Sequence, residues 1–281
     1  MTDEPVRAAL ERHGLWAKKS FGQHFLLDLN LTRKIARAAG DLKGRPVIEV
    51  GPGPGGLTRA LLEAGADPLI LIERDARFAP LLEEFGAEAS GRLRLILADA
   101  LEVDEGALLA EAGAVGPAAI ISNLPYNVGT PLLVKWLKAS PAWRGPMTLM
   151  FQKEVAERIV AHAGTDAYGR LAVLAQAVCA AQLVLEVPAR AFTPPPKVAS
   201  AVVHLTTLSE PFADLAALET VTAAAFGQRR KMLRSALKSL GAAAEGLIAA
   251  AGLDPQARAE TVPVAGFLAL AMAWRAAQRP A

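Results

Sequence analysis

Apolar residues in the first 150 positions fall into short runs separated by stretches with helical spacing. The runs are 47–50 (VIEV), 69–72 (LILI), 93–97 (LRLIL), 118–121 (AAII) and 147–151 (MTLMF). A helical pattern such as LTRALLEAG follows the first run and its glycine-rich turn. Strand and helix alternating at this spacing predict a doubly wound, mostly parallel sheet.

Two later apolar runs have no helix between them. QLVLEVP (182–188) and SAVVHLTTL (200–208) are separated only by the turn-rich stretch ARAFTPPPKVA. This arrangement predicts an antiparallel hairpin at the edge of the sheet. Beyond it, Ser209-Glu210-Pro211 reads as a linker before alanine- and leucine-rich helices. We therefore expect an α/β domain at 1–208 and a small all-α domain at 209–281.

Composition narrows the class of protein. The chain has 281 residues, of which 52% are hydrophobic and 21% charged, so we expect a folded globular protein. The longest charge-free window, 112–134, holds too many Gly and Pro residues to form a uniform helix across about 30 Å of hydrocarbon. No basic segment followed by an apolar run opens the sequence, so we expect no signal peptide. A single cysteine, Cys179, excludes an internal disulfide and provides no metal-ligand cluster. A cytoplasmic protein without membrane or metal partners fits these features.

Positive charge is concentrated locally although the net charge is only +2. No acid lies between Thr220 and Ala244, and this interval contains Arg229, Arg230, Lys231, Arg234 and Lys238. An upstream cluster contains Arg7, Arg12, Lys18, Lys19, Arg33, Lys34 and Arg37, with a few acids among them. Local patches of this kind attract polyanions.

The stretch FGQRRKMLRSALKSL (226–240) predicts an amphipathic helix. Phe226, Leu233, Leu237 and Leu240 share one stripe, and Arg230, Arg234 and Lys238 recur at i, i+4 and i+8 on a neighbouring face. A charged stripe is usually a solvated face. This one lacks balancing acids, so contact with phosphates is the favoured interpretation.

The stretch EVGPGPGG (49–56) places glycines between a strand and a helix. Alone it fits a plain tight turn equally well. Glu73, about 20 residues on at the end of the next strand, can bind both hydroxyls of a ribose. No Lys-Ser/Thr follows the glycines as in a P-loop, and Glu49 would repel a pyrophosphate. An acid at that position suits a cationic ligand such as the sulfonium amino acid of S-adenosylmethionine.

Asp99 ends the third predicted strand. It can be a helix N-cap, which Asp often provides, or it can accept a hydrogen bond from the cofactor's adenine amino group. Gly51, Glu73 and Asp99 stand at three successive strand ends, where ligands of such sheets bind, and this favours the second interpretation.

The fourth strand runs into AIISNLPYNVGTP (119–131), which resembles the Asn/Asp-Pro-Pro-Tyr motif of methyltransferases acting on exocyclic amino groups. The Asn123 side chain and the Leu124 carbonyl can accept the two N–H groups of an adenine N6. Pro125 would keep that carbonyl aimed at the amine, and Tyr126 would stack on the base. An asparagine turn with a buried tyrosine is the alternative.

Two flanking segments add candidates. In FTPPPKVASAVVHL (192–205), Phe192 can stack on the other face of the base or serve as a hydrophobic plug, and Lys197 can contact phosphate or only solvent. In KKSFGQHFLLD (18–28), Lys18 and Lys19 can face a polyanion while the segment covers the cofactor or packs on the core.

Together these motifs resemble the small-subunit (16S) rRNA adenine N6,N6-dimethyltransferase family. The matching stretches are KKSFGQHFL, IEVGPGPGGLT, IERD, ADAL, SNLPYNVGTPLL, AFTPPPKVASAV and AFGQRRKMLRSAL. The resemblance implies a Rossmann-like fold, S-adenosylmethionine as cofactor, and dimethylation of two adjacent adenosines near the 3′ end of small-subunit rRNA. It also implies action on a pre-formed 30S particle, late in ribosome biogenesis, by a monomer.

The resemblance also implies roles for single residues. Cofactor contacts fall at His24, Leu26, Gly51, Gly53, Glu73, Asp99 and Asn123, and the target-base pocket at Asn123, Leu124, Pro125, Tyr126 and Phe192. The family usually has Asn at the position of His24, and an imidazole still donates or accepts one hydrogen bond.

Three other classes of protein fit the sequence motifs less well than this family. A macrolide-resistance-type methyltransferase of large-subunit rRNA shares the catalytic motifs, but FxQRRK and TPPPKVAS favour the small-subunit family. A non-catalytic ribosome-assembly factor would need neither the glycine loop nor NLPY. A dinucleotide-dependent oxidoreductase has no use for Glu49 or NLPY.

Overall fold

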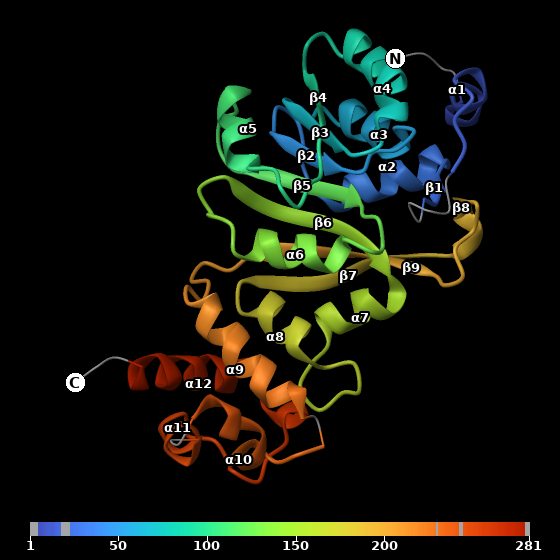
Figure 1. Cartoon of the computed structure of the whole chain (residues 1–281). Coiled ribbons are helices and arrows are strands. Elements are labelled where there is room, and N and C mark those ends of the chain that lie inside the picture. Colours follow the sequence, from blue (N-terminus) through green and yellow to red (C-terminus); the bar gives the residue numbers. More distant parts are fainter. Residues whose placement is uncertain (1–4, 18–22, 229, 242–243, 279–281) are drawn as a thin grey trace. The chain divides into compact units, whose positions relative to one another are not determined.

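The chain folds into two compact units in a computed structural model that describes residues 5–17, 23–228, 230–241 and 244–278 (Figure 1). The first unit comprises Met1–Ala156 and Gln182–Thr206, and the second Glu157–Ala181 and Thr207–Ala281. The second unit thus takes in a segment that precedes the edge strands, and the predicted domain at 209–281 stays a prediction.

The first unit is built on a sheet of seven strands in the order β4-β3-β2-β5-β6-β9-β7. Its strands are β2 (Val47–Val50), β3 (Leu69–Glu73), β4 (Leu93–Leu97), β5 (Ala118–Asn123), β6 (Arg144–Gln152), β7 (Cys179–Val187) and β9 (Ser200–Thr207). Strands β2 to β6 pair in parallel, and β9 runs antiparallel to β6. The predicted α/β fold with antiparallel edge strands is confirmed.

Strand order reverses between β2 and β5. The chain moves outward from β2 to β3 and β4, then returns to β5 on the other side of β2, with Val47 opposite Ala119. Right-handed crossovers then place helices on both faces of the sheet and leave a crevice at the carboxyl ends of β2 and β5. Gly51 and Asn123 stand at those two ends.

The central strands are apolar throughout because both of their faces are covered. All of β2 and β3 is buried, whereas Arg94 and Leu97 on the outermost strand β4 are exposed. The helices and turns of this part are α1 (Val6–Arg12), α2 (Leu29–Ala38), α3 (Gly56–Glu63), η2 (Ala76–Phe78), α4 (Ala79–Glu88), α5 (Glu105–Glu111) and α6 (Gly129–Leu137). The boundary between the two units falls inside α7 (Lys153–Val160). Asp28 and Asp104 cap α2 and α5 by accepting hydrogen bonds from their first backbone N–H groups.

A second sheet of two strands pairs β1 (Phe25–Leu26) with β8 (Phe192–Thr193), just after the turn η3 (Ala189–Ala191). The sequence pattern did not predict it, because each strand has only two residues. The pairing joins the segment before the first helical crossover to the proline-rich loop of the edge hairpin.

The second unit is helical. Its elements are α8 (Arg170–Gln176), α9 (Leu215–Gly227), α10 (Leu233–Ala236), η4 (Leu237–Leu240), α11 (Ala244–Ala250), η5 (Ala259–Thr261) and α12 (Val264–Ala277). Phe226 packs on Phe267 with ring centroids 5.2 Å apart, and the Tyr168 hydroxyl donates to the Val262 carbonyl at 2.9 Å. Among the described residues, no helix is both long enough and apolar enough to cross a membrane.

The prediction of one helix over 226–240 is wrong. Helix α9 ends at Gly227, Met232 is extended and forms a bridge with Arg258, and α10 begins only at Leu233. The backbone N–H groups of Leu233 and Arg234 donate to carbonyls of Ala257 and Pro255. Tertiary hydrogen bonds thus replace the helical bonds that a continuous helix would make. The predicted separation of apolar and basic side chains holds within this segment. Leu233 and Leu237 are buried, and Arg234 and Lys238 are exposed.

Candidate active site

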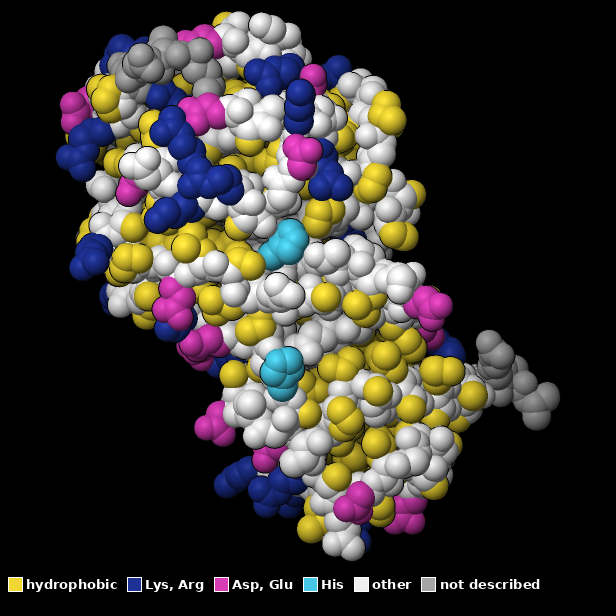
Figure 2. Space-filling model, turned by 180° about the vertical axis from the view of Figure 1, so that it is seen from behind, with side chains coloured by type: hydrophobic (Ala, Val, Ile, Leu, Met, Phe, Trp, Pro, Cys, Tyr) yellow, Lys and Arg dark blue, Asp and Glu magenta, His cyan; other side chains and the backbone are white. Residues whose placement is uncertain are grey.

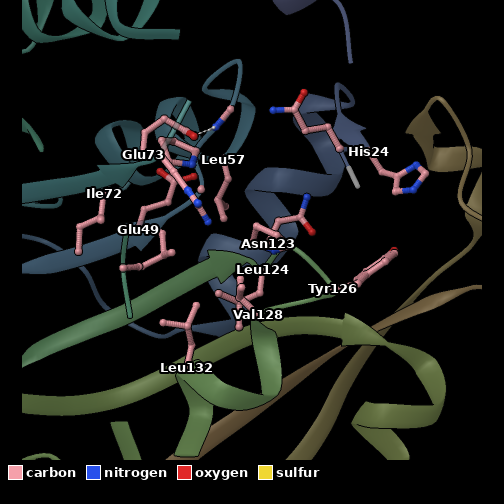
Figure 3. A pocket seen from close by; sticks show the side chains of 18 of the residues that line it. His24, Glu49, Leu57, Ile72, Glu73, Asn123, Leu124, Tyr126, Val128 and Leu132 are labelled. Carbon is pink, nitrogen blue, oxygen red and sulfur yellow. Dashed lines mark hydrogen bonds between the residues drawn. The ribbon is translucent and has the colours of Figure 1, made fainter. Parts of the chain in front are cut away.

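A cavity of about 340 Å³ opens at the carboxyl ends of β2 to β5 (Figure 3). Its wall comes from segments 23–26, 49–54, 72–74, 98–101 and 123–128, with Gly56, Leu57, Leu132 and Phe192. Every residue that the sequence suggested for the cofactor or the target base lines this cavity. The structure therefore brings together candidates that lie up to 168 positions apart in the chain, at His24 and Phe192.

The glycine loop has the backbone that its sequence suggests. Gly51 and Gly53 have φ of +66° and +52°, values that L side chains rarely adopt. A Cβ added at Gly51 would lie 3.3 Å from the Pro125 ring. The absence of a side chain at Gly51 therefore lets the end of β2 lie close to Pro125 of the NLPY stretch. Both residues line the cavity.

Glu73 holds this loop through both carboxylate oxygens. The Gly53 N–H donates to Oε2 at 3.0 Å and the Asp75 N–H to Oε1 at 2.8 Å. The side chain is 6% exposed, and burial raises the pKa of its carboxyl above the ordinary value. Each oxygen keeps a further lone pair, which can accept a ligand hydroxyl.

Glu49 is buried and lines the cavity from the carboxyl end of β2. The Thr58 hydroxyl donates to its Oε2 at 2.8 Å. Burial, aided by the nearby carboxylate of Glu73, raises the pKa of Glu49 to about 8 despite the Thr58 hydrogen bond. A ligand with positive charge would favour the ionised form, so this position fits a cation better than an anion.

Asp99 organises the turn after β4. Its Oδ1 accepts the Leu101 N–H at 3.0 Å, and its Oδ2 lies 3.1 Å from Nη1 of Arg74. The side chain is 29% exposed, so its outer lone pairs remain accessible from the cavity. The structure thus combines the capping role with a position suited to ligand contact.

The NLPY stretch links β5 to α6. Asn123 ends β5 opposite Met150, Leu124 is buried, and the Pro125 carbonyl accepts the N–H groups of Val128 and Gly129 at the start of the helix. Figure 3 shows Asn123 between the Glu73 side of the cavity and Tyr126. The loop is therefore fixed at both ends, by the sheet and by the helix.

Tyr126 is held by the edge hairpin. Its hydroxyl lies 2.6 Å from Oγ of Ser200, which is fully buried at the start of β9. Burial raises the pKa of the Tyr126 phenol. Spacing in the sequence gave no sign of Ser200, because 74 positions separate the two residues.

His24 and Phe192 close the same side. His24 Nδ1 lies 2.8 Å from the Pro194 carbonyl, and its ring centroid is 5.9 Å from that of Tyr126. Phe192 pairs with Leu26 across the small sheet and is only 3% exposed. Phe192 therefore forms part of the cavity wall, with little of its ring accessible.

A polar cluster missed by the sequence reading anchors the segment before β1. Asp75 Oδ2 accepts hydrogen bonds from Gln23 at 3.0 Å and from Arg77 at 2.5 Å. The Arg77 guanidinium holds the pKa of Asp75 below its usual range. The only sequence signal was the position of Asp75 two residues after Glu73.

The predicted RNA contacts lie outside the cavity wall. Lys197, Arg230, Lys231, Arg234 and Lys238 are exposed, and Lys18, Lys19 and Arg229 lie outside the described residues. Figure 2 shows Lys and Arg side chains in groups on the face drawn there. In the described part of the chain, no cluster of three or more His, Cys, Asp or Glu side chains could hold a metal ion.

The cavity fits S-adenosylmethionine in its donor set. Three carboxylates, Glu49, Glu73 and Asp99, suit a ligand that carries a positive charge, ribose hydroxyls and an adenine amino group. Gly51 and Gly53 line the cavity without side chains, so a ligand can approach their backbone closely.

Comparisons with known proteins agree with this site. The profile of the family described as ribosomal RNA adenine dimethylase matches residues 14–274. Ribosomal RNA small subunit methyltransferase A of Phenylobacterium zucineum (strain HLK1) is 66% identical over 277 residues, covering 96% of this chain and 93% of the relative. The protein of the same name from Caulobacter vibrioides is 62% identical over 259 residues, covering 92% and 97%.

Two solved structures share the fold. A dimethyladenosine transferase from Plasmodium falciparum is 25% identical, with a TM-score of 0.72 and coverage of 88% of this chain and 96% of that one. The 23S rRNA methyltransferase ErmE is 27% identical, with a TM-score of 0.65 and coverage of 89% and 99%. The resemblance inferred from the motifs is confirmed, and the chain belongs to the ribosomal RNA adenine dimethylase family of S-adenosylmethionine-dependent methyltransferases.

Proposed function

We propose that this protein dimethylates N6 of two adjacent adenosines near the 3′ end of small-subunit (16S) rRNA within a pre-formed 30S particle. One observation carries the proposal: the NLPY stretch lines the same cavity as the three carboxylates suited to the methyl donor. The proposal is supported by relatives of up to 66% identity whose name specifies the small ribosomal subunit.

On the cofactor side, Glu73 would accept both ribose hydroxyls and Asp99 the adenine amino group. Gly51 and Gly53 would let the ligand approach the backbone, while Leu26 and Asn123 complete the site with His24. When bound, S-adenosylmethionine supplies an electrophilic methyl group. Glu49, close to Glu73 and buried, would stabilise the positive charge of the ligand's amino acid portion.

On the base side, the Asn123 side-chain oxygen and the Leu124 carbonyl would accept the two N–H groups of adenine N6. An adenine amine is a weak nucleophile because its lone pair is delocalised into the ring. These two acceptors favour a pyramidal nitrogen whose lone pair is available for attack, and the displaced proton leaves to water. Tyr126 would stack on the base from a position fixed by Ser200, with Phe192 in the wall behind it.

The RNA backbone would be held at the exposed cations. We assign phosphate contacts to Lys197, Arg230, Lys231, Arg234 and Lys238, and, outside the described residues, to Lys18, Lys19 and Arg229. The enzyme would work as a monomer in the cytoplasm, where ribosomal subunits are assembled.

A macrolide-resistance-type activity on 23S rRNA is the second candidate, because ErmE shares 27% of its residues with this chain. The higher identity to small-subunit enzymes favours the first. A non-catalytic assembly factor on the same fold would bind the particle without methyl transfer.

The test uses radiolabelled S-adenosylmethionine with small ribosomal subunits from a strain that lacks this modification. Large subunits and naked rRNA are the controls, and nucleoside analysis identifies the product. We expect dimethyladenosine in the small subunit only. Label in the large subunit would select the resistance-type activity, and binding without label the assembly factor.

Asn123→Ala provides the matched variant. We expect methyl transfer to be abolished. Cofactor binding should be partly retained, because the carboxylates of Glu73 and Asp99 remain. Loss of folding in this variant would instead make Asn123 a structural residue.

A further inference from the structure

The turn that carries Asp99 is tied to α6 by one side chain. The Lys135 ammonium donates to the carbonyls of Ala100 at 2.7 Å and Val103 at 2.5 Å, and to Oε1 of Glu105 at 2.9 Å. An ammonium group has three N–H donors, so these contacts satisfy all of them. The Lys135 side chain is 27% exposed and Glu105 is 2% exposed.

A second donor from α6 fixes the same carboxylate. Trp136 Nε1 donates to Glu105 Oε1 at 2.7 Å, and the Trp136 ring is fully buried. Neighbouring residues of one helix thus hold the start of α5 and the turn before it. Because Glu105 is buried and hydrogen-bonded twice, the network has a defined geometry and costs free energy to break.

Around the buried Ala100, the side chains of the turn make mostly exposed contacts. Leu101 is 40% exposed, and Asp99 makes its side-chain hydrogen bond to Leu101 within the turn and its ion pair to Arg74, whose side chain is 69% exposed. Ala100 and Leu101 line the cavity beside Asp99. Lys135 binds the carbonyl of Ala100, which lines the cavity, and the carbonyl of Val103, two residues after Leu101.

Helix α6 also begins directly after the NLPY stretch, where the Pro125 carbonyl accepts the first N–H groups of the helix. The helix therefore connects the position proposed for the target amine with the turn proposed for the adenine of the cofactor.

We propose that Lys135 is a positioning residue that sets the place of Asp99 in the cavity by holding the turn from Ala100 to Val103 against α6. It touches neither ligand and acts through Asp99. The inference rests on the proposed role of Asp99 as a contact of the cofactor's adenine end.

A double-mutant cycle tests it, with cofactor affinity measured by titration calorimetry on the full chain. We expect Asp99→Ala to weaken binding about tenfold, which corresponds to about 1.4 kcal/mol. Lys135→Met, which keeps the aliphatic stem, should weaken it about fivefold alone and less than twofold in the Asp99→Ala background, because the two residues act as one unit. In a Glu73→Gln background, at the ribose end, Lys135→Met should keep its full fivefold effect.

The outcomes distinguish the proposed role of Asp99 from the proposed role of Lys135. If Asp99→Ala leaves affinity unchanged, the assignment of Asp99 in the proposed function is wrong, and the role of Lys135 falls with it. If Asp99→Ala weakens binding but Lys135→Met has no effect, or the same effect in both backgrounds, only the positioning role is overturned.

Hydrogen exchange supplies a readout that does not need the cofactor. The amides of Leu101 and Glu102 donate to Asp99, and they should exchange about tenfold faster in Lys135→Met while amides of β2 stay unchanged. Lys135→Arg should restore part of the protection. Should Lys135→Met not fold, Lys135→Gln carries the same test, since its shorter side chain has two N–H donors for the three acceptors that Lys135 holds; unchanged exchange in that variant would overturn the proposal.

Discussion

Gly51 and Pro125 meet across the crevice between β2 and β5, and an added Cβ on Gly51 would lie 3.3 Å from both Cγ and Cδ of the proline. The glycine loop and the NLPY stretch are therefore in direct contact. A change on one side displaces the other.

Gly51→Ala is expected to disturb the site beyond its effect on stability. Gly44 has the same φ of +66°, but nothing lies within 4 Å of a Cβ added there, and it precedes the amino end of β2. Both alanine variants should lose about 1–2 kcal/mol of unfolding free energy through backbone strain. Only Gly51→Ala should also lower kcat/KM, by about tenfold or more. Equal activities of the two variants in a methyl-transfer assay would contradict the role of the Gly51–Pro125 contact.

The contribution of Tyr126 to kcat/KM should come from its ring more than from its hydroxyl. Tyr126→Phe removes the contact with Ser200 and is expected to lower kcat/KM less than about tenfold, as for one neutral hydrogen bond. Tyr126→Ala removes the stacking surface and should cost about 1–3 kcal/mol, or roughly 5–150-fold. Ser200→Ala is the matched control, and combining it with Tyr126→Phe should add little. A loss with Tyr126→Phe as large as that with Tyr126→Ala would assign the function to the hydroxyl.

Glu49 should make stability fall as pH rises. Its pKa is raised from 4.5 to about 8 in the folded protein, so between these values the folded chain binds more protons than the unfolded chain. The contribution is full below pH 4.5 and is lost as pH rises through about 8. Glu49→Gln stays neutral and keeps an acceptor for Thr58. Relative to the parent, it should gain on the order of a few kcal/mol of unfolding free energy between pH 5 and 9.

Urea unfolding at pH 5, 7 and 9 measures this gain, with Glu83→Gln at an exposed position as the control. Curves of free energy against pH that run parallel for Glu49→Gln and the parent would show that Glu49 is ionised in the folded protein throughout.

His24 should tolerate Asn better than Ala. An amide can still bond to the Pro194 carbonyl and make one polar contact in the cavity, so His24→Asn is expected to keep cofactor affinity within about threefold. His24→Ala should weaken it about tenfold, near the upper value for a lost hydrogen bond. Calorimetric titration with S-adenosylmethionine decides. Equal losses in both variants would show that the imidazole ring itself, through its contact with Tyr126, is required.

The exposed cations of the second unit should contribute to the salt dependence of RNA binding. Replacing Arg230, Arg234 and Lys238 by Gln removes three exposed positive charges. If each contacts a phosphate, the slope of log affinity against log salt should decrease in magnitude by about 2–3. Lys43→Gln, at an exposed turn before β2, is the single-charge control. An unchanged slope in the triple variant would remove this segment from the RNA interface.

The strands and the cavity at their carboxyl ends were predictable because each depends on local sequence. Apolar runs such as 47–50 and 69–72 became β2 and β3, and the residues directly after them line the cavity. The rule that ligands bind beyond the carboxyl ends of such strands predicted that Gly51, Glu73 and Asp99 share one site.

What failed depended on distant partners. The continuous helix predicted over 226–240 was wrong because carbonyls of Pro255 and Ala257 hold the start of α10. The contacts of Tyr126 with Ser200 and of Gln23 with Asp75 join residues 74 and 52 positions apart, and no periodicity reports such pairs. The sequence thus predicts which residues face the cavity, and tertiary contacts decide how each is held.

The pairing of Phe25 with Thr193 has a consequence for how the protein is made. On the ribosome, the amino-terminal strand emerges long before its partner has been translated. The wall that it contributes to the cavity is therefore incomplete until the chain has been synthesised past residue 200, because β1 pairs with β8 and Tyr126 is held by Ser200. Closing such a long loop comes late in folding. The binding site of this methyltransferase would thus form only after more than two thirds of its 281 residues have been translated.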